Sequence, residues 1–142
     1  MKIDIDRLGL KNVDVDPDTL FNFPQGLAGF ETHHRFKLFH QEGGSTVFWL
    51  QSVDDSQVMF PIVVPEALDL AYDIELSDED CAVLGLSDPS DAAVVVIVYR
   101  DASADGVIGA NTRSPVILNL KSRLGIQKVL HEIHPSVLYR GR

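Results

Sequence analysis

Short apolar segments with a period of two recur along this chain, and they constrain its fold more than any other feature. Ile3 and Ile5 alternate with Asp4 and Asp6, and residues 35–39 alternate in the same way. Successive side chains of a β-strand point to opposite faces, so this period is typical of strands with one face in water and one in a core. The sequence therefore predicts a mostly β protein.

Turn residues separate these segments. Pro24 ends one strand, and Gly26 and Gly29 relax the backbone limits of the following loop. Pro61 lies inside an apolar segment and has no amide hydrogen, so we expect a free edge or a bulge there. Such regular spacing favours a single-domain β-barrel or β-sandwich. The expected strands cover residues 3–6, 13–16, 20–23, 35–39, 46–52, 58–64, 92–99, 107–111, 115–120 and 126–130.

One short helix is expected in the middle of the chain. Ser77 can cap free amides at the start of a helix, and the acids at 78–80 suit the positive end of the helix dipole. Gly85 is well placed to end this helix. Residues 66–70 are expected to form one further helical turn, and 92–99 a central strand covered on both faces.

Charge and composition indicate a cytoplasmic protein that avoids nucleic acid and membranes. The chain has 142 residues and a net charge of −9, which repels phosphates and anionic headgroups. The longest apolar run, 92–99, is far shorter than the ~20 residues of a spanning helix. Residues 121–142 contain five basic and one acidic residue, a net +4, which leaves −13 on residues 1–120. This acidic body suits basic protein partners, or serves only solubility.

Signatures of catalysis and metal binding are missing from the sequence. It has no glycine-rich phosphate loop, GxSxG, CxxC or HExxH pattern. Cys81 falls inside the expected helix, where a packed thiol is expected. Adjacent His33 and His34 would point to opposite faces of a strand, and no cysteine or spaced carboxylate joins them or the His131/His134 pair in a ligand set. We therefore expect no enzyme activity, no metal and no cofactor.

Four stretches of the sequence are unusual combinations. They read FPQGLAGFE at 23–31, FWLQSVDD at 48–55, LSDED at 76–80 followed by LGL at 84–86, and a last stretch from Asn111 to Leu130. In this order and at these distances, they resemble the FliW family of flagellar assembly factors. The resemblance covers roughly residues 2–131, so we expect a FliW-like domain at 1–131 and a divergent tail at 132–142. Gln25, Ala28 and Leu120 depart from the residues usual in the family.

The resemblance implies a compact, antiparallel, barrel-like binding protein with one short helix and no catalysis. Members of the family bind flagellin in the cytoplasm. They also bind CsrA, an RNA-binding regulator that represses flagellin translation, so that export of flagellin frees the protein to capture CsrA. An acidic partner docked beside an RNA-binding surface can exclude RNA by volume and by charge. We expect a chain that is monomeric when free.

Six residues are the expected partner contacts. Glu31, Gln51, Asp54 and Asp55 are polar groups within the family motifs that folding does not obviously require. Of Phe23 and Phe30, one is expected to pin the loop to the core and the other to face a partner. Asn111 can instead satisfy backbone groups at a turn, as can Asn119. Trp49 is expected in the core, since a large aromatic ring buries so much area. An acidic adaptor for another client, or a hydrolase with unplaced carboxylates, are the alternative functions. The expected contacts are Phe30, Glu31, Gln51, Asp54, Asp55 and Asn111.

Overall fold

The computed structural model describes residues 1–40, 46–69, 74–100 and 108–130. Within these residues the chain is mostly β, with one α-helix, α1 (Asp78–Leu84). Single 3₁₀ turns lie at Asp6–Leu8, Pro17–Thr19, Pro65–Leu68 and Pro89–Asp91. The strands are β1 (Lys2–Ile5), β2 (Leu10–Asp14), β3 (Phe21–Asn22), β4 (Arg35–His40), β5 (Phe48–Ser52), β6 (Met59–Val63), β7 (Ala92–Arg100), β8 (Ile108–Ala110), β9 (Val116–Asn119) and β10 (Leu124–Gln127). The expected turn at 41–45 and loop at 101–106 fall outside the described residues.

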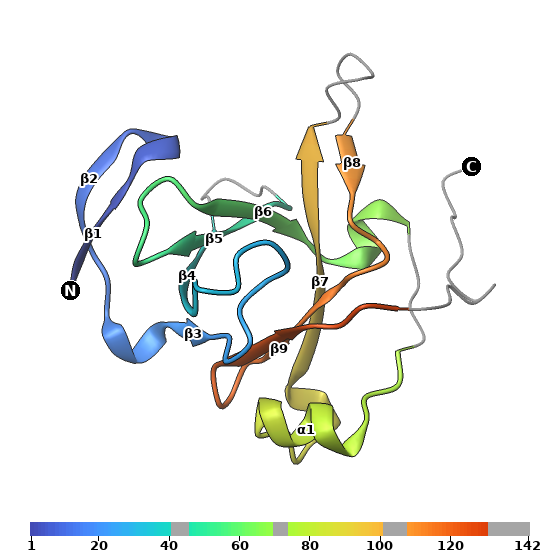
Figure 1. Ribbon diagram of the computed structural model, residues 1–142. Coiled ribbons are helices and arrows are strands. Elements are labelled where there is room, and N and C mark those ends of the chain that lie inside the picture. Colours follow the sequence, from blue (N-terminus) through green and yellow to red (C-terminus); the bar gives the residue numbers. More distant parts are fainter. Residues whose placement is uncertain (41–45, 70–73, 101–107, 131–142) are drawn as a thin grey trace.

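Seven strands close into a barrel in the order β6-β5-β4-β3-β10-β9-β7, and β7 pairs with β6 to complete it. The barrel strands pair antiparallel with one exception, the short parallel pair of β3 and β10. β1 and β2 form a separate hairpin that lies beside the barrel (Figure 1). The expected mostly β, barrel-like fold with one short helix is confirmed.

Two apolar layers explain why the strands alternate as they do. Inside the barrel, Leu50 of β5 packs with Phe36 and the other buried residues of the main core. On the outer face of β5, Trp49 packs against a second cluster that the β1–β2 hairpin supplies. The expectation that Trp49 lies in the core is therefore corrected: it is only partly buried, and Leu50 takes the interior position. The main core consists of Phe21, Phe23, Leu27, Phe36, Leu50, Ile62, Val95, Val116 and Leu118.

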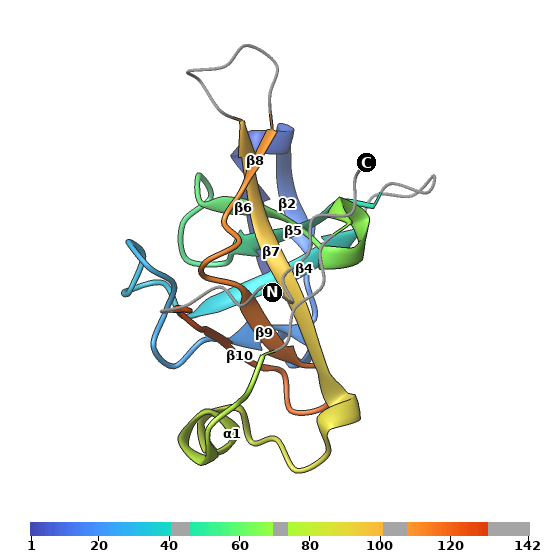
Figure 2. The same ribbon diagram turned by 90° about the vertical axis from the view of Figure 1, so that its right-hand side faces the viewer.

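The helix begins and ends where its sequence signals predict. The Ser77 hydroxyl accepts a hydrogen bond from the Asp80 amide, and the Asp80 carboxylate accepts one from the Ser77 amide, which completes a capping box. Gly85 ends the helix with a left-handed φ of 61°. Leu84 is buried between β9 and β10, and Figure 2 shows α1 below these strands. α1 therefore covers one end of the barrel.

Strand β7 changes partners along its length. Its first four residues pair with β9, Val96 and Ile97 pair with β6, and its last three pair with β8. The end of β7 and β8 thus extend beyond the barrel (Figure 1). Pairing of β6 with β7 has already stopped at Pro61, so the missing amide hydrogen disrupts no ladder there. The free edge expected at Pro61 is confirmed.

Candidate functional site

The loop between β3 and β4 folds back tightly on itself. Gly26 has a φ of +68°, and a Cβ at this position would lie 2.6 Å from the Cα of Glu31. Leu27 is buried in the main core and anchors the loop. The Glu31 carboxylate is exposed and accepts a hydrogen bond from the Gly29 amide at 2.9 Å. This bond and one from its own amide lower the pKa of Glu31, so the carboxylate stays charged at neutral pH.

The turn between β5 and β6 is held by side chains of the WLQSVDD segment. The Ser52 hydroxyl accepts hydrogen bonds from the amides of Asp54 and Asp55, both at 3.1 Å. Gln51 donates its side-chain amide to the carbonyl oxygens of Ser52 at 2.9 Å and of Asp55 at 3.2 Å. The Asp55 carboxylate accepts from the Gln57 amide at 3.0 Å. The turn is therefore rigid and presents its carboxylates in fixed positions.

Two contacts join this turn to the start of β4 and the loop before it. The Arg35 guanidinium lies 2.7 Å from the Asp54 carboxylate, and the His33 Nε2 lies 3.8 Å from that of Asp55. The His33 ring packs edge-on against Phe30, with ring centroids 5.7 Å apart. Phe30 of the 23–31 stretch is thus connected through His33 to Asp55 of the 48–55 stretch. We call residues 24–35 and 52–57 together the loop–turn surface.

The six expected contact residues have different environments. Glu31 and Asp54 are exposed and Phe30 and Asp55 are half-buried, and all four belong to the loop–turn surface. Gln51 is fully buried, and its hydrogen bonds give it a structural role in the turn instead of a surface for a partner. Asn111 lies apart from this surface, directly after β8. Its backbone amide donates a hydrogen bond to the Ile97 carbonyl at 2.8 Å.

The alternative expectation for asparagine, satisfaction of backbone groups, fits Asn119. This residue is 2% exposed. Its side chain donates to the Leu84 carbonyl at 2.9 Å and accepts from the amides of Lys121 and Ser122. Asn119 therefore ties the end of α1 to the turn between β9 and β10.

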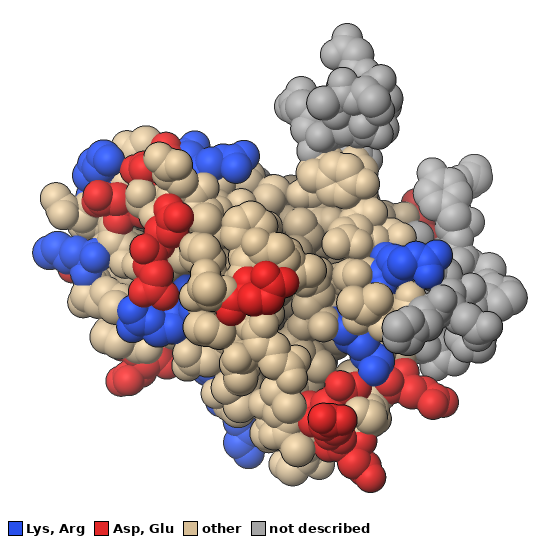
Figure 3. Space-filling model, viewed as in Figure 1, with Lys and Arg blue, Asp and Glu red and all other residues tan. Residues whose placement is uncertain are grey.

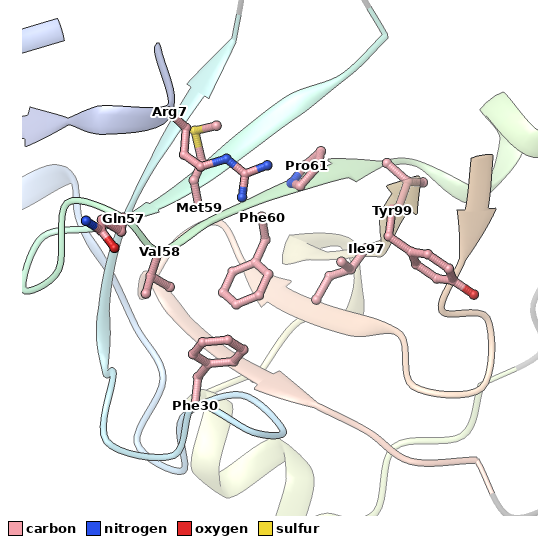
Figure 4. Close-up of a pocket in the computed structure, with 10 residues that line it drawn as sticks. Arg7, Phe30, Gln57, Val58, Met59, Phe60, Pro61, Ile97 and Tyr99 are labelled. Carbon is pink, nitrogen blue, oxygen red and sulfur yellow. The ribbon is translucent and has the colours of Figure 1, made fainter. Parts of the chain in front are cut away.

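An apolar hollow of about 380 Å³ lies next to the loop–turn surface. The rings of Phe30 and Phe60 line it in edge-to-face contact, with centroids 5.0 Å apart, and Tyr99 flanks it from β7 (Figure 4). Arg7, from the turn between β1 and β2, also lines the hollow, with its guanidinium beside β6 between Met59 and Pro61 (Figure 4). Sequence reasoning did not identify Arg7, Phe60 or Tyr99. The signal that was available is Pro61, which marks where β6 loses its partner.

Acidic side chains form separate groups on the face seen in Figure 3, and several lie beside lysine or arginine. Ion pairs explain part of this arrangement, because Lys2 pairs with Asp14 at 2.8 Å and Lys11 with Asp6 at 3.1 Å. On the loop–turn surface, Arg35 offsets the charge of Asp54. On this face, the acidic side chains of the described residues therefore form patches and not one continuous surface.

No group of three or more histidine, cysteine or acidic side chains that could hold a metal occurs among the described residues. His34 contacts the Phe23 carbonyl through Nδ1 at 2.8 Å, and Cys81 is half-buried on α1. His131 and His134 fall outside the described residues. The expected lack of catalysis and of metal stays a prediction. In the described part of the chain no helix is long and apolar enough to cross a membrane.

Comparison with known proteins gives one consistent family. The family model "FliW protein" matches residues 4–139. Flagellar assembly factor FliW of Azoarcus sp. strain BH72 is 42% identical, over 100% of this chain and 99% of its own. The protein of the same name from Chromobacterium violaceum is also 42% identical, over 90% of this chain and 92% of its own.

A solved structure agrees at the level of the fold. The crystal structure of a flagellar assembly factor FliW superposes with a TM-score of 0.77 and 24% identity, covering 99% of this chain and 94% of that one. A family model that matches nearly the whole chain, with relatives of this similarity, settles the classification. The chain belongs to the FliW family of flagellar assembly factors.

Proposed function

We propose that this protein binds flagellin in the cytoplasm and antagonises the translational regulator CsrA, with the two partners in exchange. One observation carries the proposal: Phe30, in the 23–31 stretch, packs against His33, and His33 and Arg35 contact Asp55 and Asp54 of the 48–55 stretch, so that parts of both stretches lie on the loop–turn surface. A surface built from both motifs is where a family-wide partner would bind. The rigid hydrogen bonding of the turn limits the entropy lost on binding.

The chemistry of this surface suits a basic partner such as an RNA-binding regulator. Glu31 is exposed and stays ionised, and Asp54 and Asp55 present two further carboxylates. Docked beside an RNA-binding surface, these groups repel phosphates and occupy the space RNA would use. Because Arg35 already pairs with Asp54, the turn attracts a basic partner less than its sequence suggests.

A parallel titration tests the proposal. The purified chain is titrated calorimetrically with flagellin and with CsrA, and each complex is then challenged with the other partner. Binding of both, with displacement of one by the other, is expected. If neither binds at tens of micromolar while a different client is recovered from a flagellated cell, the chain is an adaptor for that client and the proposal fails.

A charge variant tests the role of the turn in CsrA binding. Asp54→Asn with Asp55→Asn removes both charges but keeps the side-chain oxygens that accept hydrogen bonds, whereas lysine at 54 would repel Arg35. We expect CsrA binding about tenfold weaker or more, and wild-type association that slows as salt rises. The matched control neutralises two exposed adjacent acids of α1, Asp78→Asn with Glu79→Gln. Equal affinities in both variants would show that the turn is not the contact.

A further inference from the structure

Strands β6 and β7 stop pairing at one corner of the barrel, and each strand has a free backbone edge beyond that point. Their pairing covers Ile62 with Ile97 and Val63 with Val96. Beyond it, residues 59–61 pair only with β5, and residues 98–100 pair only with β8. We call the space between these two segments the β6–β7 opening. It has the form of a sheet with one strand missing.

The direction of the free backbone groups follows from hydrogen bonds on the opposite sides of both strands. The Val58 carbonyl accepts from Ser52 of β5, so the polar groups of Met59, the next residue, face away from β5 and into the opening. The Ile97 carbonyl accepts a hydrogen bond from the backbone amide of Asn111 on the β8 side. The backbone amide and carbonyl of Val98, the next residue of β7, therefore face the opening. Pro61 contributes a carbonyl oxygen and no donor there.

Side chains make the opening apolar. Phe30, Phe60 and Ile97 line the hollow beneath it, and the Tyr99 ring continues the same face outward (Figure 4). Tyr99 is 52% exposed, which is a large exposed fraction for an aromatic side chain beside an apolar hollow. Gly109 of β8 permits this position, since a Cβ there would lie 2.5 Å from the Tyr99 ring. Alternate side chains of an added strand would therefore meet apolar surface.

Arg7 gives the opening a charge preference. It is the one charged residue among those that line the hollow. Neither an ion pair nor a hydrogen bond engages its guanidinium among the described residues, and Figure 4 shows the group directed toward β6. An arginine at the rim of an apolar site recognises a carboxylate with strong, charge-assisted hydrogen bonds. An apolar segment that carries an acidic side chain therefore fits the opening. The loop–turn surface, in contrast, suits a basic partner.

We propose that an extended segment of flagellin binds in the β6–β7 opening as an added strand on the free edge of β7. Its apolar side chains enter the hollow between Phe60 and Tyr99, and one of its carboxylates pairs with Arg7. Main-chain hydrogen bonds to Val98 and Met59 supply affinity without a strict sequence requirement, and the hollow and Arg7 supply specificity. The inference rests on the proposed function only in naming flagellin as the occupant.

The test combines binding with residue-level amide exchange on the full chain. Flagellin and CsrA are titrated into wild type, into Arg7→Gln with Tyr99→Ala, and into a control pair at the far end of the barrel, Leu120→Ala with Lys121→Gln. Both sets change exposed side chains. We expect flagellin binding roughly a hundredfold weaker in the first pair and within about twofold of wild type in the control. CsrA binding is expected to stay unchanged in both.

Amide exchange followed by NMR separates edge binding from a side-chain contact alone. Saturating flagellin is expected to slow exchange of the Val98 and Met59 amides about tenfold or more, and to leave the Tyr99 amide, which faces β8, unaffected. Flagellin binding with wild-type affinity in the first pair, or without protection of Val98 and Met59, overturns the inference and leaves the proposed function intact. The inference is also overturned if CsrA, and not flagellin, slows the exchange of the Val98 and Met59 amides. Failure of wild type to bind flagellin at all refutes both.

Discussion

Replacing Gln51 by methionine and by alanine separates a structural role from a partner contact. The side chain is fully buried, its amide nitrogen donates to the carbonyls of Ser52 and Asp55, and its Oε1 lacks a hydrogen-bond partner among the described residues. Two lost hydrogen bonds destabilise by about 0.5–1.5 kcal/mol each, and removal of an unpaired buried acceptor returns about 1–3 kcal/mol. The Asp55 carbonyl keeps its bond from the Val58 amide at 3.1 Å.

The two variants therefore differ in expected stability. Methionine fills nearly the same volume, so its gains and losses largely cancel and the free energy of unfolding changes by no more than about 1 kcal/mol. Alanine loses the same hydrogen bonds and leaves a cavity, for a total loss of about 3 kcal/mol. Urea unfolding followed by the fluorescence of Trp49, the single tryptophan, measures both values.

Partner titration on the same proteins completes the experiment. If Gln51 only holds the turn, Gln51→Met binds flagellin and CsrA with wild-type affinity. A methionine variant that is fully folded yet binds either partner more than about tenfold more weakly would show that Gln51 contacts it after all. An alanine variant as stable as wild type would refute the structural role derived from its hydrogen bonds.

Two further predictions concern stability. Gly26→Ala is expected to lower the free energy of unfolding, measured in urea, by about 3 kcal/mol or more, because its Cβ would lie 2.6 Å from the backbone of Glu31. Gly9 has a similar φ and nothing within 4 Å of its Cβ position, so Gly9→Ala should lower it by only about 1 kcal/mol. Equal losses in the two variants would contradict this reasoning. Partial burial raises the pKa of Asp80, but hydrogen bonds from Lys128 and the helix start outweigh it and lower the pKa. Lys128→Met should therefore lower the free energy of unfolding by about 1 kcal/mol at pH 7. This difference from wild type should shrink as the pH falls through the lowered pKa of Asp80. A difference that does not change with pH would show that the ion pair contributes nothing.

Local signals in the sequence predicted the elements well. Ser77 and Gly85 define the helix because capping depends only on neighbouring residues. Period-two alternation located β1 and β4 and placed β2 about two residues too far along the chain, and Pro61 marked the free edge of β6, because these effects act within one strand or between neighbours. The boundary between a domain at 1–131 and a tail at 132–142, the expected monomer and the cytoplasmic location stay predictions.

Long-range packing explains what the sequence could not predict. Alternation places Trp49 and Gln51 on the outer face of β5, which a single strand would leave in water. In this protein the N-terminal hairpin covers Trp49, and the β5–β6 turn folds back over Gln51. The Asp54–Arg35 pair likewise depends on the pairing of β4 with β5, so Asp54 looked like an unexplained surface charge until the fold was known.

Phe30 connects the two candidate binding regions. Its ring packs edge-on against Phe60 in the hollow and against His33, whose Nε2 lies near Asp55 on the turn. Phe30 both lines the hollow beneath the β6–β7 opening and belongs to the loop–turn surface, so a segment in the opening and a partner on that surface would bind next to the same ring. Under the proposed function, flagellin and CsrA would therefore exclude each other by shared occupancy of one aromatic side chain and its surroundings. A partner exchange of this kind requires no conformational change of the barrel, because a ligand that binds one region removes surface from the other.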